Sequence, residues 1–247
     1  MKRSRILENN RKHILVAALL LVLISFLALL FMRSSYFQVD KIKVTGSSYY
    51  TDKEVITMAD AKVGGNIFFG VDTGDIMSRL EKNPYFKSVK VKRRLPKTLE
   101  IVVDPRTQIG AFAYGDQYVV VDSEGIVLRK TGVEPKVTVI NGLNISKMEL
   151  GKEVEVEEKD GLSTALHFLN TMRQGNLYFK SVYFQKLMVK AYIYDSLYAK
   201  GTVKEVENSI KNGQLQKVIA NLLQDGISRG AISIGSNDYM SFSPETN

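Results

Sequence analysis

A run of 19 residues without a charge, from Ile14 to Met32, is the feature that most constrains this sequence. At about 1.5 Å rise per residue, a helix of this length spans roughly 28 Å, close to a bilayer hydrocarbon core of about 30 Å. The run is apolar on every side, whereas a buried core helix carries a polar stripe. It is also longer than the apolar region of a secretory signal and lacks small residues at its end. We therefore expect residues 14–32 to form a single transmembrane signal anchor.

Basic residues gather before this run. Residues 1–13 contain five Lys or Arg residues and one Glu, and so hold half of the formal net charge of +8. Lys and Arg beside a membrane span stay on the cytoplasmic side, so residues 1–13 are predicted to be a cytoplasmic tail, too short to fold. The rest of the chain is then extracytoplasmic, as in a single-pass type II protein of the plasma membrane. The rings of Tyr36 and Phe37 suit the outer membrane interface.

The remaining composition limits the chemistry available outside the membrane. The sequence has no cysteine and only two histidines, His13 and His167, which excludes a cysteine nucleophile, a Cys-ligated zinc site and a three-histidine metal centre. His167 is expected to be an ordinary surface residue. The adjacent Glu157 and Glu158 are expected at a helix start, where they point in different directions and suit the helix dipole rather than acid–base work. We expect no catalytic residue, metal, cofactor or small-molecule substrate, and an extracytoplasmic chain argues against nucleic acid.

Residues 37–106 follow the order strand, helix, helix, strand, strand. Thr51 and Glu54 have the spacing of a capping box and predict the start of the first helix. Asp72 is the expected N-cap of the second helix. The Gly-rich stretch between the two helices is expected to be a loop rather than a phosphate-binding site. The predicted strands span residues 39–45, 86–93 and 97–103, and the last two form a hairpin.

The order of apolar, glycine and proline positions in this segment is specific over some 70 residues. The positions are Phe37, Val39, Ile42, Val44, Gly46, Glu54, Ile56, Gly65, Ile67, Phe68, Asp72, Ile76, Leu80, Pro84, Tyr85, Val89, Val91, Arg93, Pro96, Leu99, Ile101 and Val103. Together they resemble the POTRA domain of the FtsQ/DivIB family of bacterial cell-division proteins. POTRA domains also occur, usually repeated, in assembly and export proteins, so a component of that kind is an alternative.

Residues 107–243 keep a mixed pattern and are expected to form a second α/β domain with an antiparallel-rich sheet. A hairpin turn is predicted at residues 122–125, with Gly125 at positive φ. The predicted helices span residues 160–172 and 214–224. The predicted strands span residues 118–121, 126–129, 137–140, 181–184, 187–194, 231–234 and 239–242. This order resembles the second (β) domain of the same family, and residues 244–247 are a short tail. The expected fold class is α+β: an anchor, a POTRA domain and a mixed second domain.

The resemblance implies a non-enzymatic scaffold of the division septum. In this family the scaffold engages two small bitopic proteins, FtsB/DivIC and FtsL, and promotes septum formation. A physical route exists, because a terminal strand at a sheet edge leaves unpaired backbone groups that accept a partner strand. The candidate partner-binding residues are Ala231, Ile232, Ser233, Ile234, Tyr239, Met240, Ser241 and Phe242. A membrane-tethered cell-wall enzyme is a further alternative.

The predicted hairpin of the first domain concentrates positive charge. Six Lys or Arg residues lie within eleven positions, from Lys87 to Lys97. One interpretation is a solvated strand face that alternates with buried valines. The other is a docking surface for an acidic partner, anionic lipid headgroups or wall polymers. The candidate docking residues are Lys90, Lys92, Arg93, Arg94 and Lys97.

Overall fold

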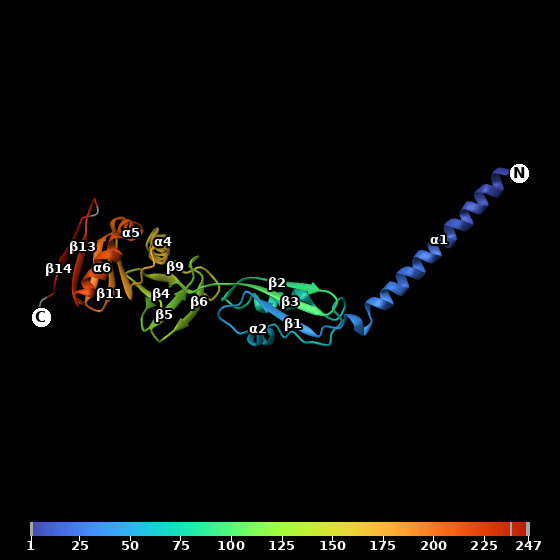
Figure 1. Cartoon of the computed structure of the whole chain (residues 1–247), viewed down its shortest axis with the longest axis horizontal. Coiled ribbons are helices and arrows are strands. Elements are labelled where there is room, and N and C mark those ends of the chain that lie inside the picture. The colour runs from blue at the N-terminus through green and yellow to red at the C-terminus, as the bar shows by residue number, and fades with distance from the viewer. Residues whose placement is uncertain (1, 238, 246–247) are drawn as a thin grey trace. The chain divides into compact units, whose positions relative to one another are not determined.

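The computed structural model describes residues 2–237 and 239–245, with side chains from residue 13 onward. The chain divides into two compact units, Met1–Pro105 and Arg106–Asn247, and the fold is α+β as predicted (Figure 1). Of the predicted tail at residues 244–247, Thr246 and Asn247 lie outside the described residues.

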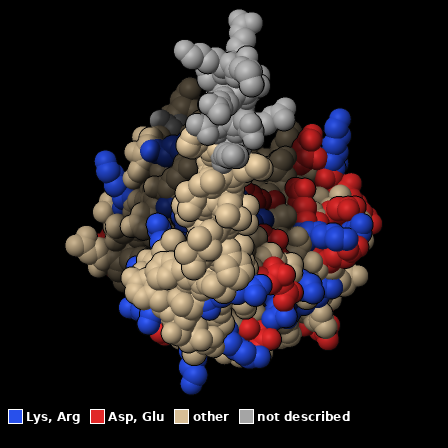
Figure 2. All heavy atoms as spheres, turned by 90° about the vertical axis from the view of Figure 1, so that its right-hand side faces the viewer, with Lys and Arg blue, Asp and Glu red and all other residues tan. Residues whose placement is uncertain are grey.

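The first unit begins with one continuous helix, α1 (Lys2–Met32). Its segment His13–Met32 is the only helix among the described residues that is long and apolar enough to cross a membrane, and none of it is buried. Residues 13–32 of α1, whose side chains are described, carry no Asp, Glu, Lys or Arg side chain in Figure 2. The helix extends back through the predicted tail, because residues 2–13 contain no Gly or Pro that would end it. Residue 13 is therefore not a break in secondary structure.

The rest of the first unit has the predicted order of strands and helices. Its elements are a 3₁₀ turn (Ser35–Phe37), β1 (Lys41–Thr45), α2 (Asp52–Met58), α3 (Thr73–Leu80), β2 (Phe86–Arg94) and β3 (Thr98–Pro105). The sheet order is β1-β3-β2, with β1 parallel and β2 antiparallel to β3. Side chains from α2 and α3, such as Val55 and Leu80, pack on Leu99, Ile101 and Val103 of β3. The helices therefore cover one face of the sheet and leave the other open.

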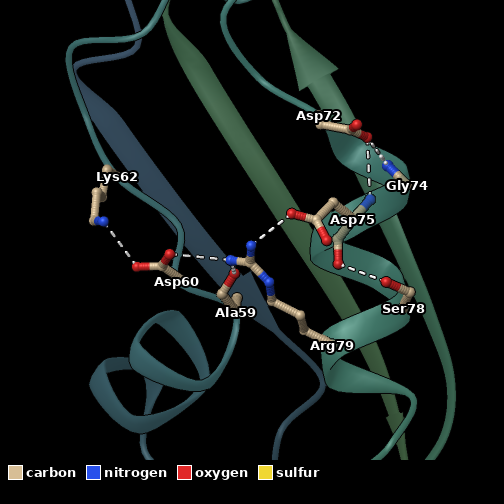
Figure 3. Close-up of polar contacts among 8 residues, drawn as sticks. All are labelled: Ala59, Asp60, Lys62, Asp72, Gly74, Asp75, Ser78 and Arg79. Atoms are coloured by element: carbon tan, nitrogen blue, oxygen red, sulfur yellow. Dashed lines mark hydrogen bonds and ion pairs between the residues drawn. The ribbon is translucent and has the colours of Figure 1, made fainter.

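Local capping signals fix the two helices where the sequence predicts them. The Thr51 amide donates to Glu54 Oε2 (2.8 Å) and the Glu54 amide donates to Thr51 Oγ1 (3.4 Å), which confirms the capping box. The hydrogen bond from the Thr51 amide, and after it one from the Thr51 hydroxyl to Glu54 Oε2 (2.8 Å), lower the pKa of the Glu54 carboxyl. Asp72 Oδ1 accepts from the amides of Gly74 (2.9 Å) and Asp75 (3.0 Å), so Asp72 is the N-cap of α3 (Figure 3).

Arg79 of α3 ties the two helices together. Its guanidinium donates to the Ala59 carbonyl (3.3 Å), to Asp60 Oδ2 (3.1 Å) and to Asp75 Oδ2 (2.6 Å), as Figure 3 shows. Ala59 caps the end of α2, and Asp75 lies in the first turn of α3. The arginine therefore fixes both ends of the loop that joins the helices.

The chain between α1 and β1 differs from the prediction. The predicted strand at residues 39–45 begins only at Lys41, because Val39 pairs with the loop near Gly65 instead of with the sheet. The prediction of an interfacial ring is wrong for Phe37, which is only 9% exposed and belongs to the core of the first unit. Its ring packs on that of Phe68 at 5.1 Å between centroids.

The second unit is built on one nine-stranded sheet with the order β14-β13-β12-β11-β10-β7-β4-β5-β6. Five of its eight pairings are antiparallel and three are parallel. The strands are β4 (Gly110–Tyr114), β5 (Gln117–Val121), β6 (Val127–Thr131), β7 (Thr138–Asn141), β10 (Ser181–Gln185), β11 (Met188–Tyr194), β12 (Leu197–Thr202), β13 (Gly230–Ile234) and β14 (Met240–Ser243). A separate ribbon pairs β8 (Ile145–Lys147) with β9 (Glu155–Val156).

Three helices share one core with this sheet: α4 (Gly161–Gln174), α5 (Val203–Lys211) and α6 (Gln214–Gln224). Their apolar faces place Phe168, Ile210 and Leu215 against the same cluster as Phe184 and Ile232 of the sheet. The predicted turn is confirmed, with Gly125 at φ 76°. Strands β4, β8, β9 and β12 and helix α5 have no counterpart among the predicted elements.

The paired glutamates lie elsewhere than predicted. Glu157 and Glu158 precede α4, which begins at Gly161, so neither residue lies on the helix. The carboxylate of Glu158 instead accepts from the Asn144 amide at 2.9 Å. The positive φ of Asp160 (59°) separates this stretch from the helix.

Candidate partner-binding edge and basic sheet face

The candidate residues at the end of the chain fall on two strands with different surroundings. β13 lies between β12 and β14, so its backbone groups are used on both sides. Ala231, Ile232 and Ile234 are accordingly buried. β14 pairs with β13 alone among the described residues and forms one edge of the nine-stranded sheet. Of the eight candidates, only those on β14 can offer backbone groups to an added strand. The candidates on β13 hold β14 in place through the pairing of the two strands.

The register shows which groups of β14 face outward. Gly235 donates its amide to the Tyr239 carbonyl at 2.9 Å, so the backbone of Tyr239 points toward β13. Successive residues of an antiparallel strand alternate in this direction, so the N–H and C=O of Met240 and Phe242 point away from β13. The side chains of Met240 and Phe242 still pack against the core. Tyr239 lies just before the strand and is 68% exposed.

Positive charge gathers on the open face of the first unit's sheet. We call Lys41, Lys43, Lys90, Lys92 and Arg94 the basic sheet face. The register places Glu100 of β3 between Lys43 of β1 and Lys92 of β2. The Arg94 Nε donates to Glu100 Oε2 at 2.8 Å. This hydrogen bond is the main reason why the pKa of Glu100 is lowered. The positive charges of Arg94, Lys43 and Lys92 lower it further.

Two of the predicted docking residues lie off this face. Arg93 points to the opposite face of β2, the face that the helices cover. There its Nε donates to the Ile67 carbonyl (2.6 Å) and its Nη2 to the Val71 carbonyl (2.9 Å). Lys97 lies at the hairpin turn, with its Nζ 3.9 Å from Asp40 Oδ2. Sequence reasoning omitted Lys41 and Lys43. Their alternation with Ile42 and Val44 was visible, but only the β1–β3 pairing brings them to the face of Lys92.

His167 lies on the surface beside Glu207. Its side chain is 62% exposed and its Nε2 lies 3.5 Å from Glu207 Oε2. This agrees with the prediction of a surface residue. Among the residues that the structure describes, no group of three or more His, Asp or Glu side chains is arranged to hold a metal ion.

Comparison with known proteins finds relatives among cell division proteins. The POTRA domain, FtsQ-type, matches residues 37–106. A cell division protein DivIB of Clostridium acetobutylicum is 24% identical over 210 residues, which cover 82% of this chain and 82% of that protein. A second DivIB, from Clostridium botulinum, is 22% identical over 244 residues, covering 98% and 92% of the two chains. A cell division protein FtsQ of Syntrophotalea carbinolica is 30% identical over 129 residues, covering 51% and 45%. Residues 37–106 follow the apolar helix directly, and together with these matches over most of the chain they support the FtsQ/DivIB family of cell division proteins.

Proposed function

We propose that this protein is a non-enzymatic scaffold of the bacterial division septum that holds other division proteins outside the plasma membrane. Residues 14–32 anchor it, the N-terminus is cytoplasmic and residues 37–243 are extracytoplasmic. The cell-division relatives support the process, and the basic residues before the anchor support the orientation. The observation that carries the binding role is the open edge of β14.

The binding mode we propose is addition of a partner strand to β14. The outward N–H and C=O groups of Met240 and Phe242 provide the main-chain hydrogen bonds, and the core beneath them keeps the strand in place. The partners are FtsB/DivIC-like and FtsL-like bitopic proteins. An edge strand suits such a partner, because an extended segment of a bitopic protein can pair along it without a preformed pocket.

The edge is tested with a pair of substitutions at one position. Met240→Pro removes both the side chain and the outward N–H, and proline is tolerated on an edge strand where its nitrogen faces away from the sheet. Met240→Ala removes the same side chain and keeps the N–H. We expect the full-length Met240→Pro variant to lose its FtsB/DivIC-like partner in pull-downs from crosslinked membranes, and Met240→Ala to retain it.

The outcomes separate the backbone from the side chain. Retention by both variants would show that the partner does not pair with β14. Loss by both variants would assign binding to the Met240 side chain and would equally contradict strand addition. Equal membrane levels and equal circular dichroism of the two purified variants show that each is folded.

We further propose that the basic sheet face docks an acidic surface of another division protein. Four lysines and one arginine share this face with two carboxylates, those of Glu100 and Asp104, and opposite charge speeds and orients association. The double variant Lys90→Glu/Lys92→Glu is expected to reduce midcell recruitment of a fluorescent fusion. Lys130→Glu, an exposed charge reversal on the second unit, is the control. Unchanged recruitment of the double variant would assign this face to solvation alone.

Depletion of the protein separates this function from the two alternatives. If the protein is a septal scaffold, depleted cells are expected to become filaments. In undepleted cells the full-length protein is expected at midcell. An assembly or export component predicts a defect in secreted or surface proteins without filaments. A wall enzyme predicts glycan cleavage by the purified chain.

A further inference from the structure

The loop between α2 and α3 folds back onto the residues that follow the membrane span. Val39 donates its amide to the Gly65 carbonyl at 2.9 Å, and Gly64 donates to the Val39 carbonyl at 2.7 Å. Ile67 donates to the Phe37 carbonyl at 2.8 Å. These three hydrogen bonds form a short pairing outside the main sheet. The loop is therefore fixed to the chain that has just left the helix.

A tight turn at residues 66–70 gives this loop a defined shape. The Asn66 carbonyl accepts from the Gly70 amide at 2.7 Å, and Asn66 Oδ1 accepts from the amides of Phe68 (3.0 Å) and Phe69 (3.3 Å). A Cβ atom at position 70 would lie 2.6 Å from the Asn66 nitrogen, so the turn requires glycine there. Arg93 of β2 holds the same loop through the carbonyls of Ile67, within the turn, and Val71, just after it. The two phenylalanines therefore point in fixed directions.

The turn is bonded directly to the end of the span. Asn66 Nδ2 donates at 2.8 Å to the carbonyl of Met32, the last residue of α1. The ring of Phe69 lies 5.6 Å from Cζ of Arg33, which is the first charged residue after the apolar run. Asn66 thus satisfies one of the carbonyls that a helix end leaves without a partner. It also places Phe69 beside the residue at which the apolar run gives way to a charge.

A second exposed ring contacts the end of the apolar run. Tyr36 stacks on Phe31 at 6.0 Å between ring centroids, and Phe31 belongs to the apolar run. Tyr36 is 55% exposed and Phe69 is 53% exposed, whereas the neighbouring Phe37 is buried in the core. A tyrosine, with its apolar ring and polar hydroxyl, favours the boundary between hydrocarbon and headgroups, and an exposed phenylalanine can bury its apolar ring in the same layer. Both exposed rings are therefore where a lipid interface would cover them.

We propose that Tyr36 and Phe69 dock the POTRA domain onto the headgroup layer of the outer leaflet, so that the loop at residues 63–71 is a second membrane contact beside the anchor helix. This proposal rests on the anchoring proposed above. The cationic Arg33, 5.6 Å from the Phe69 ring and three residues before Tyr36, suits a lipid phosphate. Because the loop is hydrogen-bonded to both the span and the domain, the contact restricts how the domain swings on its anchor.

The absence of tryptophan from the sequence makes a direct test possible. The full-length Phe69→Trp variant has one tryptophan and is reconstituted into phosphatidylcholine/phosphatidylglycerol vesicles. One set of vesicles carries bromine on the acyl chains near the headgroup, and another carries it near the chain end. We expect blue-shifted emission and a larger loss of intensity with the shallow bromine than with the deep one. Tyr36→Trp is a second reporter with the same expectation.

Two matched variants make the result decisive. Tyr49→Trp places tryptophan on a ring that is 51% exposed in the same domain, after β1 rather than beside α1, and is expected to keep its emission in both sets of vesicles. Leu23→Trp lies in the middle of the apolar run and is expected to lose most intensity with the deep bromine. Quenching of Leu23→Trp without quenching of Phe69→Trp and Tyr36→Trp would overturn the docking and leave the anchor intact. A lack of quenching in Leu23→Trp would overturn the anchor and the docking together.

Discussion

Removal of the Asp122 carboxylate is expected to destabilise the second unit more than any other single charge deletion near the turn at residues 122–125. Asp122 is buried, with a side chain 4% exposed, and it pairs with Arg106, which is 15% exposed. Its Oδ1 also accepts from the amides of Glu124 and Ile126, each at 2.9 Å. One carboxylate therefore closes the turn between β5 and β6 and compensates a largely buried cation.

The magnitude follows from these contacts. Asp122→Ala leaves two partly buried amides without their acceptor, at about 1 kcal/mol each, and removes one partner of Arg106, at about 1–2 kcal/mol. Arg106 also donates to Glu124 at 2.7 Å. The loss of Asp122 therefore destabilises the fold less than it would if Arg106 were left as a buried charge without any partner. We expect the free energy of unfolding to fall by about 3–4 kcal/mol in Asp122→Ala. Asp122→Asn keeps an oxygen for the amides and should lose about 1–2 kcal/mol.

The measurement is hydrogen exchange by mass spectrometry on β5 and β6 in the full chain, with urea to reach global unfolding. Glu124→Ala is the control, because a side chain that is 46% exposed should contribute less than about 1 kcal/mol. The expected order of destabilisation is Asp122→Ala, then Asp122→Asn, then Glu124→Ala. Equal losses in the two Asp122 variants would show that the amide contacts contribute nothing, and would refute the reasoning.

Two further predictions concern backbone strain and charge. Gly142→Ala should lower the free energy of unfolding by more than about 2 kcal/mol in urea titrations, since φ is +86° and a Cβ would lie 2.1 Å from the Phe184 carbonyl oxygen. Gly115→Ala, at φ +59° with open space around it, should cost less, and a cost equal to that of Gly142→Ala would contradict the role of the close contact. Arg94→Met should raise the pKa of Glu100 toward its ordinary value in an NMR titration of the carboxyl carbon. Because the folded-state pKa of Glu100 is lowered, the stability that its carboxylate contributes is present above the unfolded-state pKa and is lost as pH falls through the folded-state pKa. An unchanged pKa of Glu100 in Arg94→Met would count against the pairing of the two side chains.

Elements with strong local signals were predictable. The capping box at Thr51 and the N-cap at Asp72 began helices where expected, because caps act within a few residues. Helix α6 matched its predicted bounds, since its apolar residues recur at helical spacing. Helix α5 was missed although Thr202 and Glu205 form a second capping box. Its apolar face is short, with Val206 and Ile210 as the buried aliphatic residues among polar neighbours.

Elements buried on both faces gave weaker signals. Strand β4 is central in the nine-stranded sheet, and its residues Gly110, Ala111 and Phe112 are buried in succession. Such a strand has no alternation of apolar and polar residues, so periodicity does not distinguish it from other apolar segments. Phe37 was misplaced for a related reason. An aromatic residue just after a span suits either the interface or a core, and only the contact with Phe68 decides between them.

The sequence alone determined the long apolar helix, the two capped helices of the first domain and the resemblance to the FtsQ/DivIB family, because those depend on composition and on spacing within a few turns. Tertiary structure alone decided that β14 rather than β13 is the sheet edge, and that Arg93 leaves the basic sheet face while Lys43 joins it. It also brought Asn66 to the carbonyl of Met32, 34 positions earlier in the chain. The physical reason is that side-chain alternation is a local property, whereas strand order and loop contacts depend on pairing between segments far apart in the sequence.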